Sequence, residues 1–153
     1  MIAGVLLIAL FNAVDVARYY YLRMEVENAT QMAAQAGWKT CDVAHLPATT
    51  NCSGFSSAVT ASVQSSSLSS SVALASGYPS EGWYCVNSTG SLVYVNDVGS
   101  KPANCSSVGN ASGQPGDYVK VKTTYAYVPI FGSISIGSTL PSPITSTTFM
   151  RLQ

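Results

Sequence analysis

Charge is scarce in this sequence of 153 residues, and the scarcity excludes several classes of function. Charged residues make up 9% of the chain, and the seven cations balance the seven carboxylates. Lysine and arginine form no basic patch, so we expect no nucleic acid partner. The acidic residues enter no Ser-His-Asp-like or phosphate-binding motif, and the single histidine, His45, is expected to be a loop residue. We therefore expect no enzyme, no bound cofactor and no metal site.

Cysteine is also sparse, and its spacing does not favour zinc, because no Cys-x-x-Cys pair occurs. The four cysteines are Cys41, Cys52, Cys85 and Cys105. We favour sequential pairing into two disulfides, which closes two short loops, although the sequence leaves the other two connectivities open. Each bridge would contribute about 2–4 kcal/mol. Disulfides also indicate an oxidising compartment, the periplasm or the cell exterior.

Long hydrophobic runs are confined to residues 1–37, which we expect to form an N-terminal helix. The segment opens with MIAGVLLIALF and runs from Asn12 to Ala36 without glycine or proline. From Tyr19 onward, small or apolar residues recur at three- and four-residue steps, whereas the first half is apolar on every side. We expect a helix over residues 2–36, about 50 Å long at about 1.5 Å per residue, that ends at Gly37 as a left-handed cap. A bilayer or copies of the same helix must cover its first half.

The same segment does not read as a cleaved secretory signal. No basic residue precedes the apolar run, since the first cation is Arg18, and no small-residue cleavage site follows it. We therefore expect a retained hydrophobic helix that serves as a membrane anchor or a filament core.

Residues 38–153 are expected to form a small α+β head. Ser53 is a candidate N-cap for a second helix. Strict alternation makes the run after Asp117 the surest strand, and two β-prone runs before it read as a hairpin. We expect three or four antiparallel strands, the second helix and the two disulfides. The expected elements are a helix at 54–70 and strands at 83–86, 92–95, 117–128 and 144–152.

These features resemble a known family. Asp15-Val16-Ala17-Arg18-Tyr19 leads into a small-residue stripe at 28–37, and the chain closes with a Pro-Ile-Phe-Gly loop at 129–132 and the run TSTTFMR at 145–151. The whole is similar to the TadE-like pilins and pseudopilins of bacterial tight-adherence pili, over Leu6–Gly37 and Tyr118–Arg151. The resemblance implies a processed prepilin that is exported, anchored in the inner membrane by its helix, and built into or onto a surface filament by a pilus assembly machinery. Many pilins carry glutamate at mature position five, where this chain would have Val5 if Met1 were the mature start. Either Met1 is not that start, or the pairing role has moved, for example to Asp15.

Two segments are candidates for an assembly interface. Asp15 and Arg18 lie three apart on the helix, and they read either as an ionic register mark between subunits or as the point where the stalk meets the membrane surface, with Arg18 snorkelling. The three tyrosines at 19–21 suit a membrane interface or stalk packing. The apolar loop 128–143 either folds onto its own sheet or, as we favour, contacts a neighbouring subunit. The predicted interface residues are Leu6, Leu7, Leu10, Phe11, Asp15, Arg18, Tyr19, Tyr20, Tyr21, Leu22, Ile130, Phe131, Ile134 and Ile136.

The expected function is structural. We expect a subunit that polymerises with copies of itself into a helical extracellular filament used for attachment. A minor pseudopilin and a monomeric membrane-anchored binding module remain alternatives. The loop asparagines Asn51, Asn87, Asn104 and Asn110 each begin an Asn-x-Ser/Thr sequence and are candidate glycosylation sites.

Overall fold

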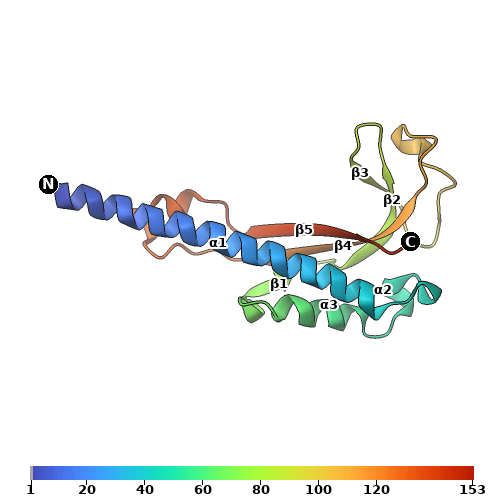
Figure 1. Ribbon diagram of the computed structural model, residues 1–153, viewed down its shortest axis with the longest axis horizontal. Coiled ribbons are helices and arrows are strands. Elements are labelled where there is room, and N and C mark those ends of the chain that lie inside the picture. Colours follow the sequence, from blue (N-terminus) through green and yellow to red (C-terminus); the bar gives the residue numbers. More distant parts are fainter. Residues whose placement is uncertain (1) are drawn as a thin grey trace.

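The computed structural model describes residues 2–153, apart from the side chains of Ile2 and Ser133. Helix α1 spans Ile2–Thr40 and runs almost the full length of the molecule, with its N-terminal part projecting beyond the head (Figure 1). Met1, the first residue of the expected helical segment 1–37, lies outside the described residues. The expectation of a long N-terminal helix followed by an α+β head is confirmed.

Gly37 lies inside α1, so the expectation that it ends the helix is wrong. Its backbone is not left-handed, and an added Cβ would lie 2.9 Å from Cε2 of Phe55. Glycine is needed here because the second helix packs directly against the backbone of α1. The helix continues to Thr40, whose hydroxyl donates a hydrogen bond to the carbonyl of Ala36 at 2.7 Å.

The second helix is shorter than expected. Helix α3 spans Phe55–Gln64, and its N-cap is Gly54, with φ at 88°, rather than Ser53. Its buried residues Phe55, Val59 and Val63 recur every four positions and form one apolar face. The serines that follow are poor helix formers, and the chain turns instead through a short 3-10 segment, Ser69–Ser71. A further short helix, α2 at Ala48–Asn51, was not expected from the sequence.

The sheet has five antiparallel strands rather than three or four, arranged around β4. Along one edge β4 pairs with β5, and along the other it pairs with β1 at one end and β2 at the other. Strand β3 pairs with β2 as the expected hairpin. The additional strand is β1, which has only three residues and was not predicted. The strands are β1 Val72–Leu74, β2 Ser80–Val86, β3 Leu92–Asn96, β4 Gly116–Tyr125 and β5 Ile144–Arg151.

Helices α1 and α3 cover one face of the sheet, and the core lies between these helices and the sheet (Figure 1). The alternation predicted for β4 is confirmed: Val119, Val121 and Thr123 are buried beneath the helices, and the residues between them point to the other face. The Thr123 hydroxyl lies 2.6 Å from the Thr30 hydroxyl of α1, so this polar pair is satisfied within the core.

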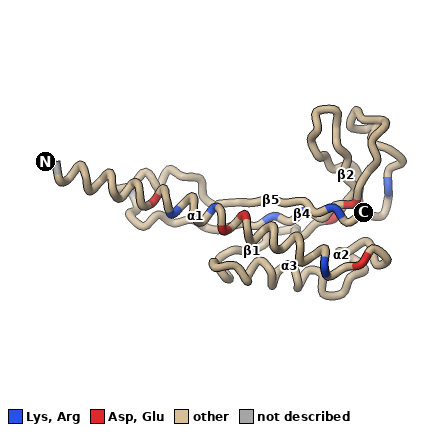
Figure 2. The backbone as a smooth tube through the Cα atoms, viewed as in Figure 1, with Lys and Arg blue, Asp and Glu red and all other residues tan. Residues whose placement is uncertain are grey.

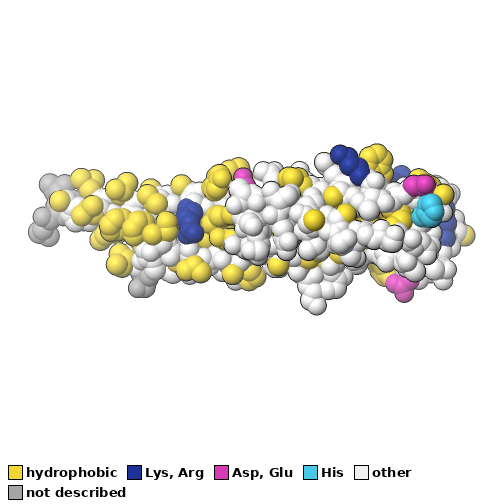
Figure 3. Space-filling view, turned by 90° about the horizontal axis from the view of Figure 1, so that it is seen from below, with side chains coloured by type: hydrophobic (Ala, Val, Ile, Leu, Met, Phe, Trp, Pro, Cys, Tyr) yellow, Lys and Arg dark blue, Asp and Glu magenta, His cyan; other side chains and the backbone are white. Residues whose placement is uncertain are grey.

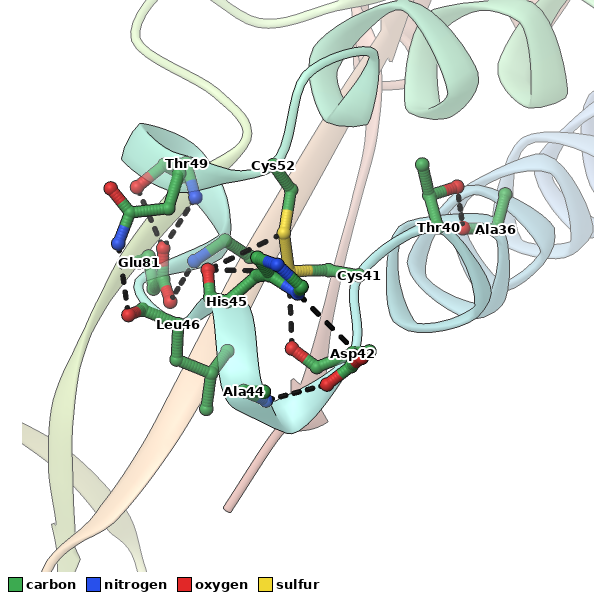
Figure 4. The surroundings of a disulfide bond; sticks show 12 residues. Ala36, Thr40, Cys41, Asp42, Ala44, His45, Leu46, Thr49, Cys52 and Glu81 are labelled. Atoms are coloured by element: carbon green, nitrogen blue, oxygen red, sulfur yellow. Dashed lines mark hydrogen bonds and ion pairs between the residues drawn. A yellow bond between two sulfur atoms is a disulfide. The ribbon is translucent and has the colours of Figure 1, made fainter.

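Both disulfides form in the sequential pairing that we favoured, Cys41–Cys52 and Cys85–Cys105. The first joins the segment after α1 to the segment before α3, as Figure 4 shows. The carboxylate of Glu81 on β2 holds the same region by accepting hydrogen bonds from the backbone N–H groups of Ala48 and Thr49, at 2.8 and 2.7 Å (Figure 4). This region is therefore tied to both α1 and the sheet.

Candidate functional site

The N-terminal part of α1 presents apolar side chains without cover from the rest of the chain. Val5, Leu6, Leu7, Ile8 and Leu10 are between 51% and 69% exposed. Among the described residues, α1 is long and apolar enough to cross a membrane. The first charged residue of the helix is Asp15, and in Figure 2 the described part of the tube before the first red segment carries no charged residue. The candidate site consists of this uncharged stretch of α1 and of the loop 128–143, which lies beside it.

A loop from the other end of the chain folds back onto α1 at Asp15. The Asp15 carboxylate accepts hydrogen bonds from the backbone N–H groups of Ile130 and Phe131, at 2.9 and 3.3 Å. The Asp15 side chain is fully buried by this contact. An anion inside an apolar region must be paired or hydrogen-bonded, and here peptide N–H groups of the same chain meet that need.

Polar groups on either side of Asp15 strengthen the attachment. The Asn12 side-chain oxygen accepts a hydrogen bond from the backbone N–H of Ile136 at 2.7 Å. The Arg18 guanidinium donates to the carbonyl of Val128 at 2.7 Å, and the Tyr127 hydroxyl donates to the carbonyl of Asp15 at 3.2 Å. The loop is thus fastened along almost two turns of α1, mainly through its own backbone.

Two packing contacts complete the attachment of the loop to α1, which we call the junction. The rings of Phe11 and Phe131 stack with centroids 4.3 Å apart and an interplanar angle of 20°. Gly137 approaches the helix so closely that an added Cβ would lie 2.9 Å from the Cβ of Asp15. The loop therefore has an aromatic ring and a glycine at the positions where the helix requires stacking and close approach, although the two segments lie more than 110 positions apart in the sequence.

The side chains of the loop isoleucines do not take part in this attachment. Ile130, Ile134 and Ile136 are 58%, 66% and 55% exposed, because the backbone that carries them faces the helix. They lie beside the bare part of α1, and apolar side chains gather at this end of the molecule in Figure 3. We call the combined region the N-terminal apolar surface. It consists of Val5, Leu6, Leu7, Ile8, Leu10, Ile130, Ile134 and Ile136.

The predicted interface residues fall into three groups. Asp15, Tyr19 and Leu22 are buried within the chain, and the Tyr19 ring meets the Tyr127 ring edge to face at 5.1 Å. Phe11, Arg18 and Phe131 are occupied by the loop contact. The remaining predicted residues are exposed: Leu6, Leu7, Leu10, Tyr20, Tyr21, Ile130, Ile134 and Ile136. The backbone of the loop thus folds onto its own chain, whereas contact of its exposed isoleucines with a neighbouring subunit stays a prediction.

Sequence reasoning missed three residues of the junction, Asn12, Tyr127 and Gly137. Asn12 carried a usable signal, because an amide within an apolar helix needs a hydrogen-bond partner. Tyr127 and Gly137 carried no such signal, because their roles depend on which part of α1 the loop packs against. The junction is nevertheless organised around Asp15, which the sequence singles out, together with Arg18, as a candidate register mark or membrane-surface position.

Asp117 stands out in the head, away from the N-terminal apolar surface. Its side chain is 3% exposed, and its Oδ1 has no hydrogen-bond partner among the described residues. Burial, together with the neighbouring carboxyl group of Glu81, raises the pKa of Asp117 from 3.8 to about 7 against the opposing effect of Lys101. This carboxyl group is consequently protonated in weakly acidic solution.

The other predicted residues lie in loops of the head. His45 sits in a 3-10 turn, with Nδ1 3.6 Å from the Asp42 carboxylate (Figure 4). Among residues 2–153, no three histidine, cysteine or acidic side chains are grouped to hold a metal ion. The candidate glycosylation residues Asn51 and Asn104 are exposed, and Asn87 and Asn110 are half-buried. The Asn87 side chain accepts a hydrogen bond from the backbone N–H of Ser91 in its own turn, whereas the Asn110 side chain donates one to the carbonyl of Val86 on β2.

Comparison with known proteins adds no family to this description. No protein-family model matches the chain, and neither does any curated protein or solved structure.

Proposed function

We propose that this chain is a structural subunit of an extracellular pilus-like filament, and that it polymerises through its N-terminal helix for attachment to surfaces. The observation that carries the proposal is the N-terminal apolar surface, in which exposed apolar side chains of the helix lie beside exposed isoleucine side chains of the loop. A large exposed apolar patch on a folded protein marks a contact with another apolar partner. Head-to-tail packing of identical helices would cover it and generate a helical polymer.

The contacts of the first charged residues favour a filament over a permanent bilayer span as the final state. Asp15 is fully buried against the backbone of the loop, and Arg18 donates a hydrogen bond to the carbonyl of Val128. A bilayer that covered α1 as far as these residues would also have to take in the polar backbone of the loop. We infer that the inner membrane holds the subunit before assembly, that an assembly machinery extracts it, and that neighbouring helices then replace lipid.

The proposal is tested by placing a charge on the apolar surface of the full-length chain in its native host. We expect Leu6→Lys and Ile134→Lys each to abolish or strongly reduce filaments in sheared cell-surface material examined by electron microscopy. Val43→Lys is the matched control, because Val43 is 63% exposed at the other end of α1 and should leave filament yield unchanged. Normal filaments from both test variants would overturn the proposal.

Mass spectrometry of the same material separates the alternatives. A dominant band of this chain supports a major subunit, and a trace amount in filaments of another protein supports a minor pseudopilin. A chain that appears only as a detergent-extracted monomer supports the anchored binding module and contradicts polymerisation.

A further inference from the structure

The face of the sheet that points away from α1 carries aromatic rings and cations together. Alternation along β4 and its antiparallel register with β5 place these residues on one side. Tyr118 lies opposite Arg151, Lys120 opposite Phe149 and Lys122 opposite Thr147. Strands β2 and β3 add two tyrosines that face each other in register. We call this the outer sheet face; it comprises Tyr84, Tyr94, Tyr118, Lys120, Lys122, Phe149 and Arg151.

The rings form one cluster centred on Tyr84. Its ring meets those of Tyr94, Tyr118 and Phe149 edge to face, with centroids 5.5, 5.8 and 5.4 Å away. Tyr84 is buried by these neighbours, whereas Tyr94 and Phe149 are 49% and 39% exposed. The cluster therefore offers a rigid platform of ring faces and edges to solvent.

The cations of the outer sheet face have no carboxylate partners among residues 2–153. Lys120 instead lies over aromatic rings, with Nζ 5.5 Å from the Phe149 centroid and 5.6 Å from the Tyr78 centroid. Three of the seven cations of a neutral chain thus gather on this face. At the margin of this face, the Asp97 carboxylate accepts a hydrogen bond from the Tyr94 hydroxyl, and Nε of Arg151 donates one to the main-chain oxygen of Gln153 at 2.8 Å.

We propose that the outer sheet face binds an anionic polysaccharide. The C–H faces of sugar rings pack on exposed aromatic rings, and sugar carboxylates suit the lysines and Arg151. The hydroxyls of Thr145 and Thr147, which alternate with Phe149 along β5, supply hydrogen bonds for sugar hydroxyls. The two lysines are two positions apart on one strand, about 7 Å, so they contact successive charged units of an extended polymer.

Charge excludes a second copy of this chain as the occupant. Exposed acidic groups elsewhere are scattered among the described residues: Glu27 pairs with Arg23, Glu25 accepts a hydrogen bond from Ser67, and Asp42 lies beside His45. No described part of the molecule thus presents a free acidic patch to match three cations. A nucleic acid is disfavoured because its phosphates are dense, at about one charge per 1.7 Å of duplex, and tight binding needs many more cations than three.

The test uses the full-length chain in detergent, so it does not depend on filament formation. Immobilised polygalacturonate is the probe, neutral dextran is the uncharged control, and polyglutamate is the anionic control without sugar rings. We expect binding to polygalacturonate that weakens with added salt and exceeds binding to both controls. The variant Lys120→Gln/Lys122→Gln should bind at least tenfold more weakly, and Phe149→Ala should bind several-fold more weakly.

Arg23→Gln/Lys101→Gln is the matched control variant, because it removes the same number of charges from outside the outer sheet face and should bind as the native chain does. Equal binding to polyglutamate, or equal loss in the control variant, would show nonspecific charge attraction and overturn the proposal. Absence of polygalacturonate binding, or preferential binding of single-stranded DNA added as a competitor, would overturn it as well.

Discussion

The carboxylate of Asp15 accepts a hydrogen bond from the backbone N–H of Ile130, 115 positions later in the chain, at 2.9 Å. This contact joins the N-terminal helix to the C-terminal loop, so that exposed side chains of both segments form the N-terminal apolar surface. Because the loop is held through its backbone, its isoleucines remain free for another apolar partner. Because one carboxylate holds the loop at this point, substitution of Asp15 alone should loosen it.

Asp15→Ala should release the loop while leaving the head folded. The N–H groups of Ile130 and Phe131 would lose their acceptor, and unpaired buried donors are costly. Hydrogen exchange measured by mass spectrometry should accelerate at least tenfold in peptides covering 128–137 and stay unchanged in β4. Asp15→Asn retains an acceptor oxygen and should show a smaller effect. Unchanged exchange in the loop of Asp15→Ala would refute the role assigned to this carboxylate.

Gly37→Ala should destabilise the head by about 1–3 kcal/mol, because the new methyl group would meet the Phe55 ring at 2.9 Å and overpack the contact between α1 and α3. Thermal unfolding followed by circular dichroism measures the loss. Gly99→Ala is a suitable control, since its Cβ would meet no atom within 4 Å and its φ is not left-handed. A melting temperature equal to that of the native chain in Gly37→Ala would show that the helices separate easily.

The stability of the head should fall as pH rises from about 4 to about 7. The pKa of Asp117 is raised from 3.8 to about 7 on folding, so across this interval the folded state binds a proton that the unfolded state has released. Its contribution is present in full below pH 4 and is lost as pH approaches 7. Melting temperatures measured across this range should decline in the native chain and decline less in Asp117→Asn. Parallel pH profiles of the two proteins would contradict the shifted pKa.

Each disulfide should contribute about 3 kcal/mol by restricting the unfolded chain. The cysteines of Cys41–Cys52 and Cys85–Cys105 are 11 and 20 positions apart, so the second bridge should contribute slightly more. Paired Cys→Ser variants, compared by chemical denaturation, measure both values. A reducing agent should shift the native midpoint and leave unchanged the midpoint of a variant that lacks all four cysteines.

The sequence was sufficient for features that depend on local patterning. Alternation of valine and lysine in β4 identified both its strand character and its buried face, and the uniformly apolar start of α1 identified the segment that lacks in-chain cover. The two disulfides followed from spacing, although the choice among three pairings needed the structure.

Features set by tertiary contact were not predictable in the same way. Gly37 reads as a helix cap until Phe55 is placed against it, and the three residues of β1 become a strand only through pairing with β4. At the candidate site, Asp15 signalled that a partner was required. Which partner it meets depends on a loop more than 110 positions away, and no local pattern encodes that distance.

The β2–β3 hairpin lies at the opposite end of the molecule from the N-terminal apolar surface (Figure 1). Gly90 at its tip has φ at 82°, and no atom lies within 4 Å of the position that a Cβ would take. Foreign peptides inserted beside Gly90 would point into solvent without disturbing the junction at Asp15. The fold therefore provides a natural display position for an epitope tag, by which labelled subunits can be followed in living cells.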